Sequence, residues 1–229
     1  MNRKLSIIIP VLNESRIINA AIDHLYHLKS AGDLEIIVVD GNPAGNTINA
    51  ITRPCVKTVI SAKGRGLQMN IGAAIAAGEV LLFLHADTML SHDALEQIFK
   101  AFEQDDVVGG AFDLGIQSEK KIFRLIEKTA SIRSRLTGIP YGDQAIFLEK
   151  RFFDRVGGFK DIPIMEDVEL MRRIKKAGLK IKFVPRKVQT DPRRWEKEGI
   201  VYGTLRNWTL ITLYLLGVSP QKLKKFYAS

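Results

Sequence analysis

Cysteine is nearly absent from this chain of 229 residues, and the single Cys55 excludes a disulfide within the chain. Cysteine and histidine also fail to cluster at any spacing typical of a zinc site. Because disulfides persist mainly in oxidising compartments, a chain this poor in cysteine fits a reducing environment. We therefore expect a cytoplasmic protein.

Long apolar runs are lacking as well. The first run, Leu5–Ile9, is interrupted by Pro10 and the polar pair Asn13-Glu14, so it is too short for a signal peptide and fits a first strand. The second run, Trp208–Val218, has 11 residues, or roughly 16 Å of helix, whereas a bilayer core needs about 30 Å. This segment should not span a membrane. We expect it to pack on the protein body, on a second copy in a homodimer, or peripherally on the inner face of a membrane.

Acidic residues are scarce near the C-terminus. The whole chain has an ordinary globular composition, with 46% hydrophobic and 26% charged residues and a net charge of +9. Residues 172–229 hold 15 Lys and Arg against 3 Asp and Glu, so the basic excess lies in the last quarter. Such asymmetry predicts an anionic partner: a nucleoside diphosphate, an acidic lipid surface or a nucleic acid.

Strand-like and helix-like segments alternate through the first half of the chain. Short apolar runs predict strands, and apolar residues at helical spacing predict helices. We expect strands at 5–10, 35–40, 55–60 and 80–84, and helices at 14–29, 66–77 and 91–102, the last with Ser91 as its N-cap. This alternation with short connections is typical of a parallel sheet covered by helices.

The second half is more mixed. We expect strands at 107–116, 143–148 and 181–184, and helices at 119–136, 151–156, 168–177, 196–216 and 221–227. No repeat, low-complexity tract or flexible linker interrupts the sequence. The prediction is one α/β domain, residues 1–195, followed by an apolar and basic helical extension, residues 196–229.

Polar residues gather where the apolar strands end. Asn13 and Glu14 follow the first strand, Asp40 ends the second, and Asp87 follows the fourth. Open α/β sheets hold their binding sites at the carboxyl ends of strands. The pair Glu166-Asp167 opens an Arg-rich helix, where the positive helix end favours acids. Helix capping would explain only one of the two, so we expect both at the site.

Taken in order, these motifs resemble the family 2 glycosyltransferases, which have the GT-A fold. The resemblance covers about residues 4–200. It implies a Rossmann-like, mostly parallel mixed sheet flanked by helices, with a C-terminal helical segment. The stretch His85-Ala86-Asp87-Thr88 looks most similar to a small bacterial branch of the family that is sometimes linked to arsenosugar-type pathways.

The resemblance implies a site for a nucleotide sugar. Pro10, Asn13, Glu14 and Asp40 match positions that hold the base and ribose, and a carboxylate can accept hydrogen bonds from a uracil N–H or from ribose hydroxyls. The basic turn Lys63–Arg65 matches a contact to nucleotide or phosphate, although Lys63 and Arg65 would also fit as plain surface charges.

The resemblance also implies a metal. Asp87 stands at the last position of the family's Asp-x-Asp motif and would bind Mg²⁺ or Mn²⁺, hard cations that take oxygen ligands and substrate phosphates. His85 replaces the first acid of that motif. It is either a group beside the metal, a contact to phosphate, or a structural residue.

On the acceptor side, Asp167 matches the catalytic base of the family, and Glu166 supports it. Asp143 is expected either to hold an acceptor hydroxyl or to form a plain turn. In similar enzymes a sugar hydroxyl loses its proton to the base and attacks the anomeric carbon, in a single displacement with inversion.

The segment Asp191–Trp195 resembles the Gln-x-x-Arg-Trp motif of processive family members. Asp191 replaces the Gln, which weakens the case for polymer synthesis. Arg193 or Arg194 would clamp the leaving diphosphate, and Trp195 would face the acceptor. The predicted function is transfer of a sugar from a nucleoside diphosphate, with UDP as the expected nucleotide, to an unknown hydroxyl acceptor.

Rival functions fit less well. A nucleotidyltransferase would need a Gly-rich phosphate loop after the first strand, where this chain has Pro10. A dinucleotide-binding oxidoreductase would need Gly or Ala where Met69 stands. A basic module that binds membrane surfaces without catalysis remains an alternative, whereas nucleic acid is not expected as a partner because its recognition motifs are missing.

Overall fold

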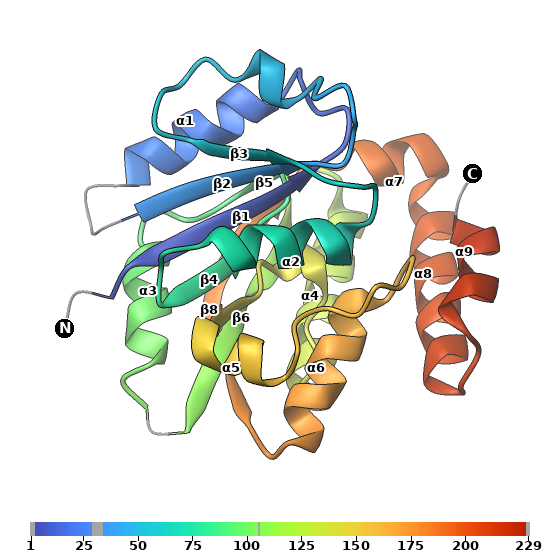
Figure 1. Cartoon of the computed structure of the whole chain (residues 1–229). Coiled ribbons are helices and arrows are strands. Elements are labelled where there is room, and N and C mark those ends of the chain that lie inside the picture. The colour runs from blue at the N-terminus through green and yellow to red at the C-terminus, as the bar shows by residue number, and fades with distance from the viewer. Residues whose placement is uncertain (1–2, 29–33, 105, 228–229) are drawn as a thin grey trace.

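The computed structural model describes residues 3–28, 34–104 and 106–227. Its centre is one mixed sheet of eight strands in the spatial order β3-β2-β1-β4-β7-β6-β8-β5 (Figure 1). Helices flank this sheet, and α8 and α9 stand together at the end of the molecule toward which β1 points (Figure 1). The architecture is the mixed α/β arrangement predicted from the sequence.

The first four strands form the parallel part of the sheet. They are β1 (Leu5–Val11), β2 (Leu34–Asp40), β3 (Lys57–Ile60) and β4 (Val80–Phe83). Their parallel pairing confirms the arrangement predicted from the alternation of strands and helices. Because neighbouring parallel strands end at one edge, the polar residues that follow β1, β2 and β4 share that edge.

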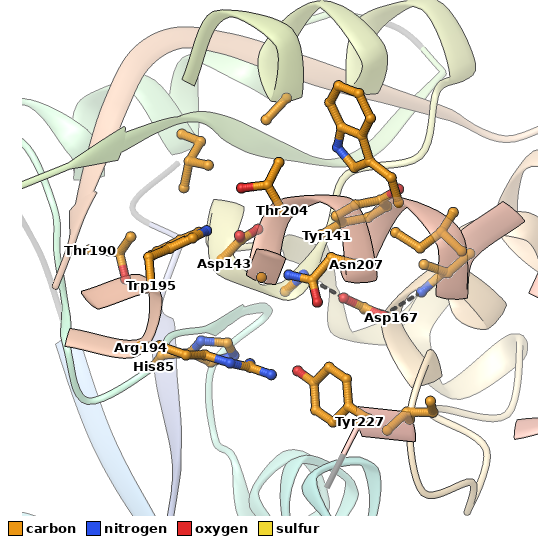
Figure 2. A pocket seen from close by; sticks show the side chains of 18 of the residues that line it. His85, Tyr141, Asp143, Asp167, Thr190, Arg194, Trp195, Thr204, Asn207 and Tyr227 are labelled. Carbon is orange, nitrogen blue, oxygen red and sulfur yellow. Dashed lines mark hydrogen bonds between the residues drawn. The ribbon is translucent and has the colours of Figure 1, made fainter. Parts of the chain in front are cut away.

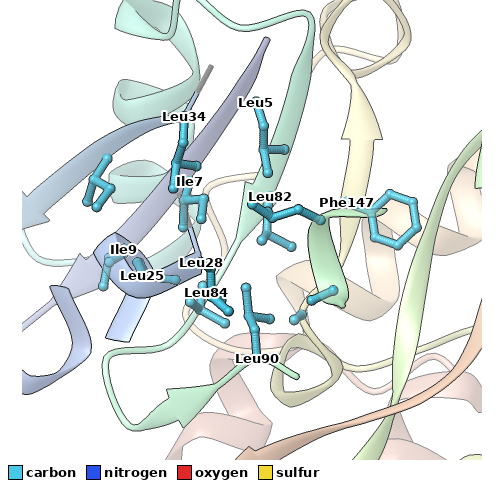
Figure 3. Close-up of a cluster of buried hydrophobic side chains, with 14 of the residues drawn as sticks. Leu5, Ile7, Ile9, Leu25, Leu28, Leu34, Leu82, Leu84, Leu90 and Phe147 are labelled. Atoms are coloured by element: carbon cyan, nitrogen blue, oxygen red, sulfur yellow. The ribbon is translucent and has the colours of Figure 1, made fainter. Parts of the chain in front are cut away.

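Apolar side chains cover both faces of these strands. Successive residues of a strand point to opposite faces, so Ile7 belongs to the layer under α1 (Ile18–Leu28) and α3 (Ala94–Ala101), and Ile8 to the layer under α2 (Arg65–Ile75). Figure 3 shows the first of these layers. Each fully buried aliphatic side chain contributes about 1.5–3 kcal/mol. Burial on both faces explains why these strands are unbroken apolar runs in the sequence.

The remaining strands make the sheet mixed. They are β5 (Thr88–Met89), β6 (Val107–Ile116), β7 (Phe147–Glu149) and β8 (Lys180–Thr190). β7 runs antiparallel to β4 and β6, β8 runs parallel to β6, and β5 runs antiparallel to β8. The helices of this half are α4 (Lys121–Thr137), α5 (Lys150–Arg155) and α6 (Glu166–Lys176).

The strand predicted at 143–148 was wrong in its first four residues. Residues Gly142–Gln144 form a short 3₁₀ turn, η3, and β7 begins only at Phe147. The Gln144 side chain is fully buried. Its Oε1 accepts hydrogen bonds from the Tyr141 amide N–H at 3.1 Å and from the Ser134 hydroxyl at 2.6 Å. These tertiary contacts hold the segment in a turn, and Ala145 follows in left-handed conformation with φ 47°.

Other boundaries also differ from the prediction. The helix predicted with Ser91 as its N-cap begins at Ala94, so Asp93 is at the N-cap position, and the Ser91 hydroxyl donates to the Asp93 carboxylate at 2.8 Å. The strand predicted at 181–184 extends to Thr190 along β6, with a register shift between Phe112 and Asp113. Pairing with a neighbouring strand, which local sequence does not reveal, sets this length.

The predicted helix 196–216 is two helices. Gly199 has φ +90°, a conformation that ends α7 (Arg193–Glu198) before α8 (Ile200–Leu215) begins. The predicted limit between residues 195 and 196 therefore falls inside α7. The last helix is α9 (Pro220–Tyr227).

The C-terminal helices contact the body through a small apolar cluster. Leu210 of α8 and Leu223 of α9 are buried against Ile164, in the loop before α6. On its other side α8 is exposed, for example at Val201 and Leu205, which are 60% and 56% exposed. No helix in the described ranges is both long and apolar enough to cross a membrane.

Candidate active site

A cleft lies where β4 and β8 end, bordered by α4, the start of α6 and the C-terminal helices (Figure 2). Segments that are far apart in the sequence form its walls. Its lining includes nine of the residues singled out in the sequence: Arg65, His85, Asp87, Asp143, Glu166, Asp167, Asp191, Arg194 and Trp195. The predicted site residues thus converge, although five others, described below, lie outside this lining.

Asp167 sits in the first turn of α6. The preceding Met165 has a left-handed backbone with φ 66°, which turns the chain into the helix. The Asp167 Oδ2 atom accepts a hydrogen bond from the Gly142 amide at 2.6 Å, and Oδ1 accepts one from the Val168 amide at 2.7 Å. These bonds fix the orientation of a carboxylate that faces the cleft (Figure 2).

Glu166 is directed to the other side of the same turn. It is 2% exposed, and its Oε1 atom pairs with Arg65 Nε at 2.7 Å. Burial raises the pKa of Glu166, and the neighbouring Arg65 charge opposes that shift. For Arg65, the Glu166 charge is the main cause of a raised pKa. The pair therefore joins the start of α2 to the start of α6.

His85 lies beside Arg65. Its Nε2 atom is 3.3 Å from Arg65 Nη1, and because arginine only donates, Nε2 is the acceptor. Burial, with the positive charge of Arg65, lowers the pKa of His85 to about 3. The imidazole is therefore neutral at physiological pH, and Arg65 occupies its Nε2 atom.

The C-terminal helix α9 also contacts Arg65. Tyr227 of α9 contacts the Arg65 guanidinium and contributes, after Glu166, to its raised pKa. The Arg194 guanidinium lies 4.4 Å from the centre of the Tyr227 ring. Figure 2 shows Tyr227, Arg194 and His85 on one side of the cleft, with Tyr141 and Asp143 on the opposite side.

A second charged cluster stands near the ends of β1 and β4. Arg193 Nη2 lies 2.8 Å from Glu14 Oε1 and 3.3 Å from Asp87 Oδ2. The Asp191 amide donates to the Asp87 carbonyl at 3.1 Å, which ties the end of β8 to the loop after β4. The structure thus brings Glu14 and Asp87 together around one arginine.

Asp40 stabilises the loop that follows β2. It is fully buried, and its two carboxylate oxygens accept hydrogen bonds from the amides of Asn42 and Thr47, each at 2.9 Å. Asn13, in a left-handed conformation, accepts a hydrogen bond from the Asn42 side chain at 2.7 Å. The loops after β1 and β2 are therefore joined directly.

Five predicted donor-site residues are not in the lining of the cleft. They are Pro10, Asn13, Glu14, Asp40 and Lys63. The first four belong to β1, β2 and the loops after them, beside the Glu14–Arg193 pair. Lys63 is exposed in the turn before α2. Of the two basic residues of that turn, only Arg65 takes part in the cleft.

Asp143 and Arg133 both line the cleft and interact through their charges. Burial raises the pKa of Asp143 to about 6, although the Arg133 charge lowers it and Asp167 adds to the increase. Burial also lowers the pKa of Arg133 to about 10. The Arg133 guanidinium stacks on the Tyr141 ring, with 3.1 Å between Cζ and the ring centre.

Sequence reasoning missed several residues that line the cleft. They are Arg133, Tyr141, Thr204, Asn207, Trp208 and Tyr227. Arg133 gave no signal in the sequence, because the buried stripe of α4 is formed by Phe123, Glu127 and Ser134 and Arg133 lies beside it. The α8 and α9 residues carried no signal either.

A divalent cation would find a partial site here. Within the described ranges, no three His, Cys, Asp or Glu side chains form a cluster that could hold a metal. Asp87 lines the cleft and offers one carboxylate, which now pairs with Arg193. Mg²⁺ is commonly held by one or two carboxylates, with substrate phosphates and water completing its shell. The residues present fit a site of that kind.

Known proteins resemble this chain in sequence. The family model of Glycosyl transferase family 2 matches residues 6–160. The chain is 33% identical over 120 residues to an uncharacterized glycosyltransferase of Nostoc sp., an alignment that covers 49% of this chain and 37% of the relative. It is 26% identical over 220 residues to the probable glycosyltransferase YdaM of Bacillus subtilis, covering 84% of this chain and 52% of the relative. The chain therefore spans about half or less of the length of these curated relatives.

A solved structure resembles it in fold. The mannosyltransferase PcManGT from Pyrobaculum calidifontis, in complex with GDP-mannose and Mn²⁺, matches with a TM-score of 0.63 and 19% identity. The match covers 82% of this chain and 57% of the neighbour. The eight-stranded sheet flanked by helices is the GT-A glycosyltransferase fold, as predicted.

Proposed function

Because the chain belongs to glycosyl transferase family 2, we propose that it transfers a sugar from a nucleoside diphosphate to an acceptor hydroxyl, with inversion. One observation carries the proposal. A carboxylate, Asp167, is held by the Gly142 amide at 2.6 Å in a cleft whose other side has Arg65, His85 and Arg194. A fixed proton acceptor beside cationic groups suits displacement of an anionic leaving group.

Asp167 is the base of this reaction. It takes the proton from the acceptor hydroxyl, whose oxygen forms a bond to the anomeric carbon as the bond from that carbon to the diphosphate breaks. The proton remains on Asp167, and the electron pair of the broken bond leaves with the diphosphate. Glu166 supports the site by holding Arg65 in place.

Arg194 binds the leaving diphosphate. Among the described residues its ion-pair partner is Glu198 at 3.5 Å, a long contact that leaves N–H groups for phosphate oxygens. Asp87 would hold the divalent cation, which when bound neutralises charge on the diphosphate. The PcManGT complex with Mn²⁺ supports such a cation without deciding between Mg²⁺ and Mn²⁺.

The loops after β1 and β2 hold the nucleoside. Asn13 and Asp40 already order these loops, and Pro10, Glu14 and Lys63 lie in the same region. UDP is the nucleotide implied by the family resemblance, whereas the neighbour PcManGT binds GDP-mannose. The assignment to the bacterial branch linked to arsenosugar-type pathways stays a prediction.

Calorimetry tests the donor half of the proposal. UDP and GDP are titrated into the protein with Mn²⁺, with Mg²⁺ and with EDTA. We expect one nucleotide to bind, with affinity falling at least tenfold in EDTA and in Asp87→Ala. The control is Asp154→Ala, which removes a carboxylate that is 58% exposed on α5. Equal affinity in all conditions would remove Asp87 and the cation from the proposal.

Sugar transfer itself is tested by donor consumption. Release of nucleoside diphosphate from a panel of UDP- and GDP-sugars is followed with and without added acceptors. We expect slow hydrolysis of one donor that accelerates with the right acceptor. Nucleotide binding without release from any donor would instead favour a protein that binds nucleotide sugars without transfer.

A further inference from the structure

Arg133 carries a charge that the folded chain leaves partly unsatisfied. Its Nε and Nη1 atoms are buried and have no hydrogen-bond partner among the described residues. Only Nη2 is used, donating to the Ser134 hydroxyl at 2.9 Å and to Gln144 Oε1 at 3.4 Å. Burying a cation without partners is unfavourable, so an unused guanidinium edge in a cleft indicates a ligand that completes it.

The guanidinium is held in place before any ligand binds. It stacks on the Tyr141 ring at 3.1 Å. Its neighbour Gln144 is fixed by the Ser134 hydroxyl at 2.6 Å and by its own bond to the Phe112 carbonyl at 3.0 Å. A guanidinium fixed in this way offers its unused N–H donors to an oxyanion without first having to be ordered.

The carboxylates near Arg133 do not complete it. Asp143 and Asp167 affect Arg133 through their charge, while Nε and Nη1 stay unpaired. The Asp167 carboxylate is bound by the amides of Gly142 and Val168. The missing partner of Arg133 therefore comes from outside the described chain.

This group lies on the side of Asp167 away from the donor residues. Figure 2 shows Asp167 between Arg194, His85 and Tyr227 on one side and Tyr141 and Asp143 on the other. If Asp167 takes the acceptor's proton, the acceptor lies on the second side, with Arg133. Apolar side chains of α4 and α8 complete this wall: Ile126, Ala130, Trp208 and Ile211.

We propose that Arg133 is an anion-binding subsite for the acceptor, and that the acceptor carries a carboxylate or phosphate next to the hydroxyl that is glycosylated. This inference rests on the proposed function. The oxyanion accepts a hydrogen bond from an unused N–H group of Arg133 and so orients the hydroxyl toward Asp167. The apolar wall accommodates the rest of the acceptor, whether it is a soluble acid or the headgroup of a lipid.

Small anions test this subsite without knowledge of the acceptor. Methyl phosphate and acetate are titrated by NMR, with methanol as the neutral control, while the nucleoside diphosphate found by calorimetry occupies the donor side. We expect the wild type to bind at least one anion and not methanol. Arg133→Met should weaken that binding at least tenfold, and Arg133→Lys should weaken it less because the charge remains.

Arg135→Met is the matched control. Arg135 is on the same helix and pairs with Asp113 at 2.8 Å, so its removal should leave anion binding unchanged. Unchanged nucleoside diphosphate affinity in Arg133→Met shows that this variant folds and that the donor side is intact. Anion binding that Arg133→Met does not weaken, or that the wild type lacks, overturns the proposal.

The same variants separate the two sources of the anion. sn-Glycerol 3-phosphate represents a soluble ester, and vesicles of phosphatidylcholine with or without phosphatidic acid represent a lipid. Binding to phosphatidic acid vesicles that Arg133→Met reduces supports a lipid acceptor. Binding of the soluble ester alone supports a soluble one. If no nucleotide binds, the proposed donor function fails, but the difference between wild type and Arg133→Met for anions still decides this inference.

Discussion

The two sides of Asp167 both carry arginines, but they pair them differently. On the proposed donor side, Arg65 pairs with Glu166, and Arg193 pairs with Glu14 and Asp87. On the proposed acceptor side, Arg133 keeps two nitrogen atoms without partners in the described chain. A ligand that binds Arg65 or Arg193 must displace existing partners, whereas one that binds Arg133, or Arg194 with its long contact to Glu198, supplies missing ones. Whether an arginine already has a partner therefore says more about the ligand it binds than the number of charges on that side does.

The largest expected effect concerns the residue between the two sides. Asp167→Asn keeps the shape of the side chain and removes the proton acceptor, so turnover should fall by about 10²–10⁴-fold. Nucleotide affinity should change little, because the base contacts the acceptor. Steady-state kinetics and calorimetry measure the two quantities, with Asp154→Asn as the control. Near-normal turnover in Asp167→Asn would exclude this residue as the base.

Stability measurements compare the two sides directly. Arg65→Met leaves the buried Glu166 without its cation, and the free energy of unfolding should fall by about 3 kcal/mol. Arg133→Met removes a charge that favours ionised Asp143 but no direct ion pair, so the free energy of unfolding should fall by less, about 1 kcal/mol. Urea unfolding followed by circular dichroism measures both. The control is Arg53→Met, which removes an exposed ion pair with Asp23 and should lower the free energy of unfolding by less than about 1 kcal/mol. Equal losses of stability in Arg65→Met and Arg133→Met would contradict the comparison.

The pH dependence of stability tests the acceptor side alone. Burial raises the pKa of Asp143 to about 6, above its value of about 3.9 in the unfolded chain. Ionised Asp143 therefore destabilises the folded state, by an amount that grows as pH rises from about 4 to 6 and is complete above that range. We expect Asp143→Asn to gain about 1–2 kcal/mol at pH 8 and nothing below pH 4, since water in the cleft reduces the full effect. Urea unfolding at both pH values, with Asp154→Asn as the control, measures the gain; a gain that is the same at both pH values would have another cause.

The smallest effect should come from the C-terminal helix. Tyr227→Phe removes the hydroxyl that contacts Arg65 and keeps the ring beside Arg194. We expect a loss of about 0.5–1 kcal/mol, the usual contribution of one hydrogen bond. Thermal unfolding measures it, with Tyr202→Phe as the control because Tyr202 is 62% exposed. Equal losses in the two variants would indicate that α9 does not stabilise the donor side.

The sheet and part of the cleft could be predicted from the sequence. Strands such as β1 and β4 are buried on both faces, so their apolar runs mark them without knowledge of their partners. Acids that directly follow such strands could be expected to lie near one another, because neighbouring parallel strands end at the same edge of the sheet. The predicted convergence of Asp87, Glu166 and Asp167 on one cleft agrees with the structure, while their chemical roles stay predictions.

The rest depends on contacts between distant segments. The 3₁₀ turn at Gly142–Gln144 exists because Ser134 and Phe112 hold the Gln144 side chain. The contact of Tyr227 with Arg65 joins residues that are far apart in the sequence. No local pattern encodes such contacts. The break at Gly199 was the exception, since a glycine within a predicted helix is a recognisable signal.

The helix α8 has a consequence for how this protein diversifies. The matched family segment ends at residue 160, whereas the wall of the cleft opposite α4 is made by Thr204, Asn207 and Ile211. The same limit leaves Asp167 and Arg194 outside the matched segment and Arg133 inside it, so acceptor choice would depend on both parts of the chain. A library of variants restricted to Thr204, Asn207 and Ile211 is the most economical route to an enzyme with a new acceptor, because it leaves the base and the paired arginines untouched.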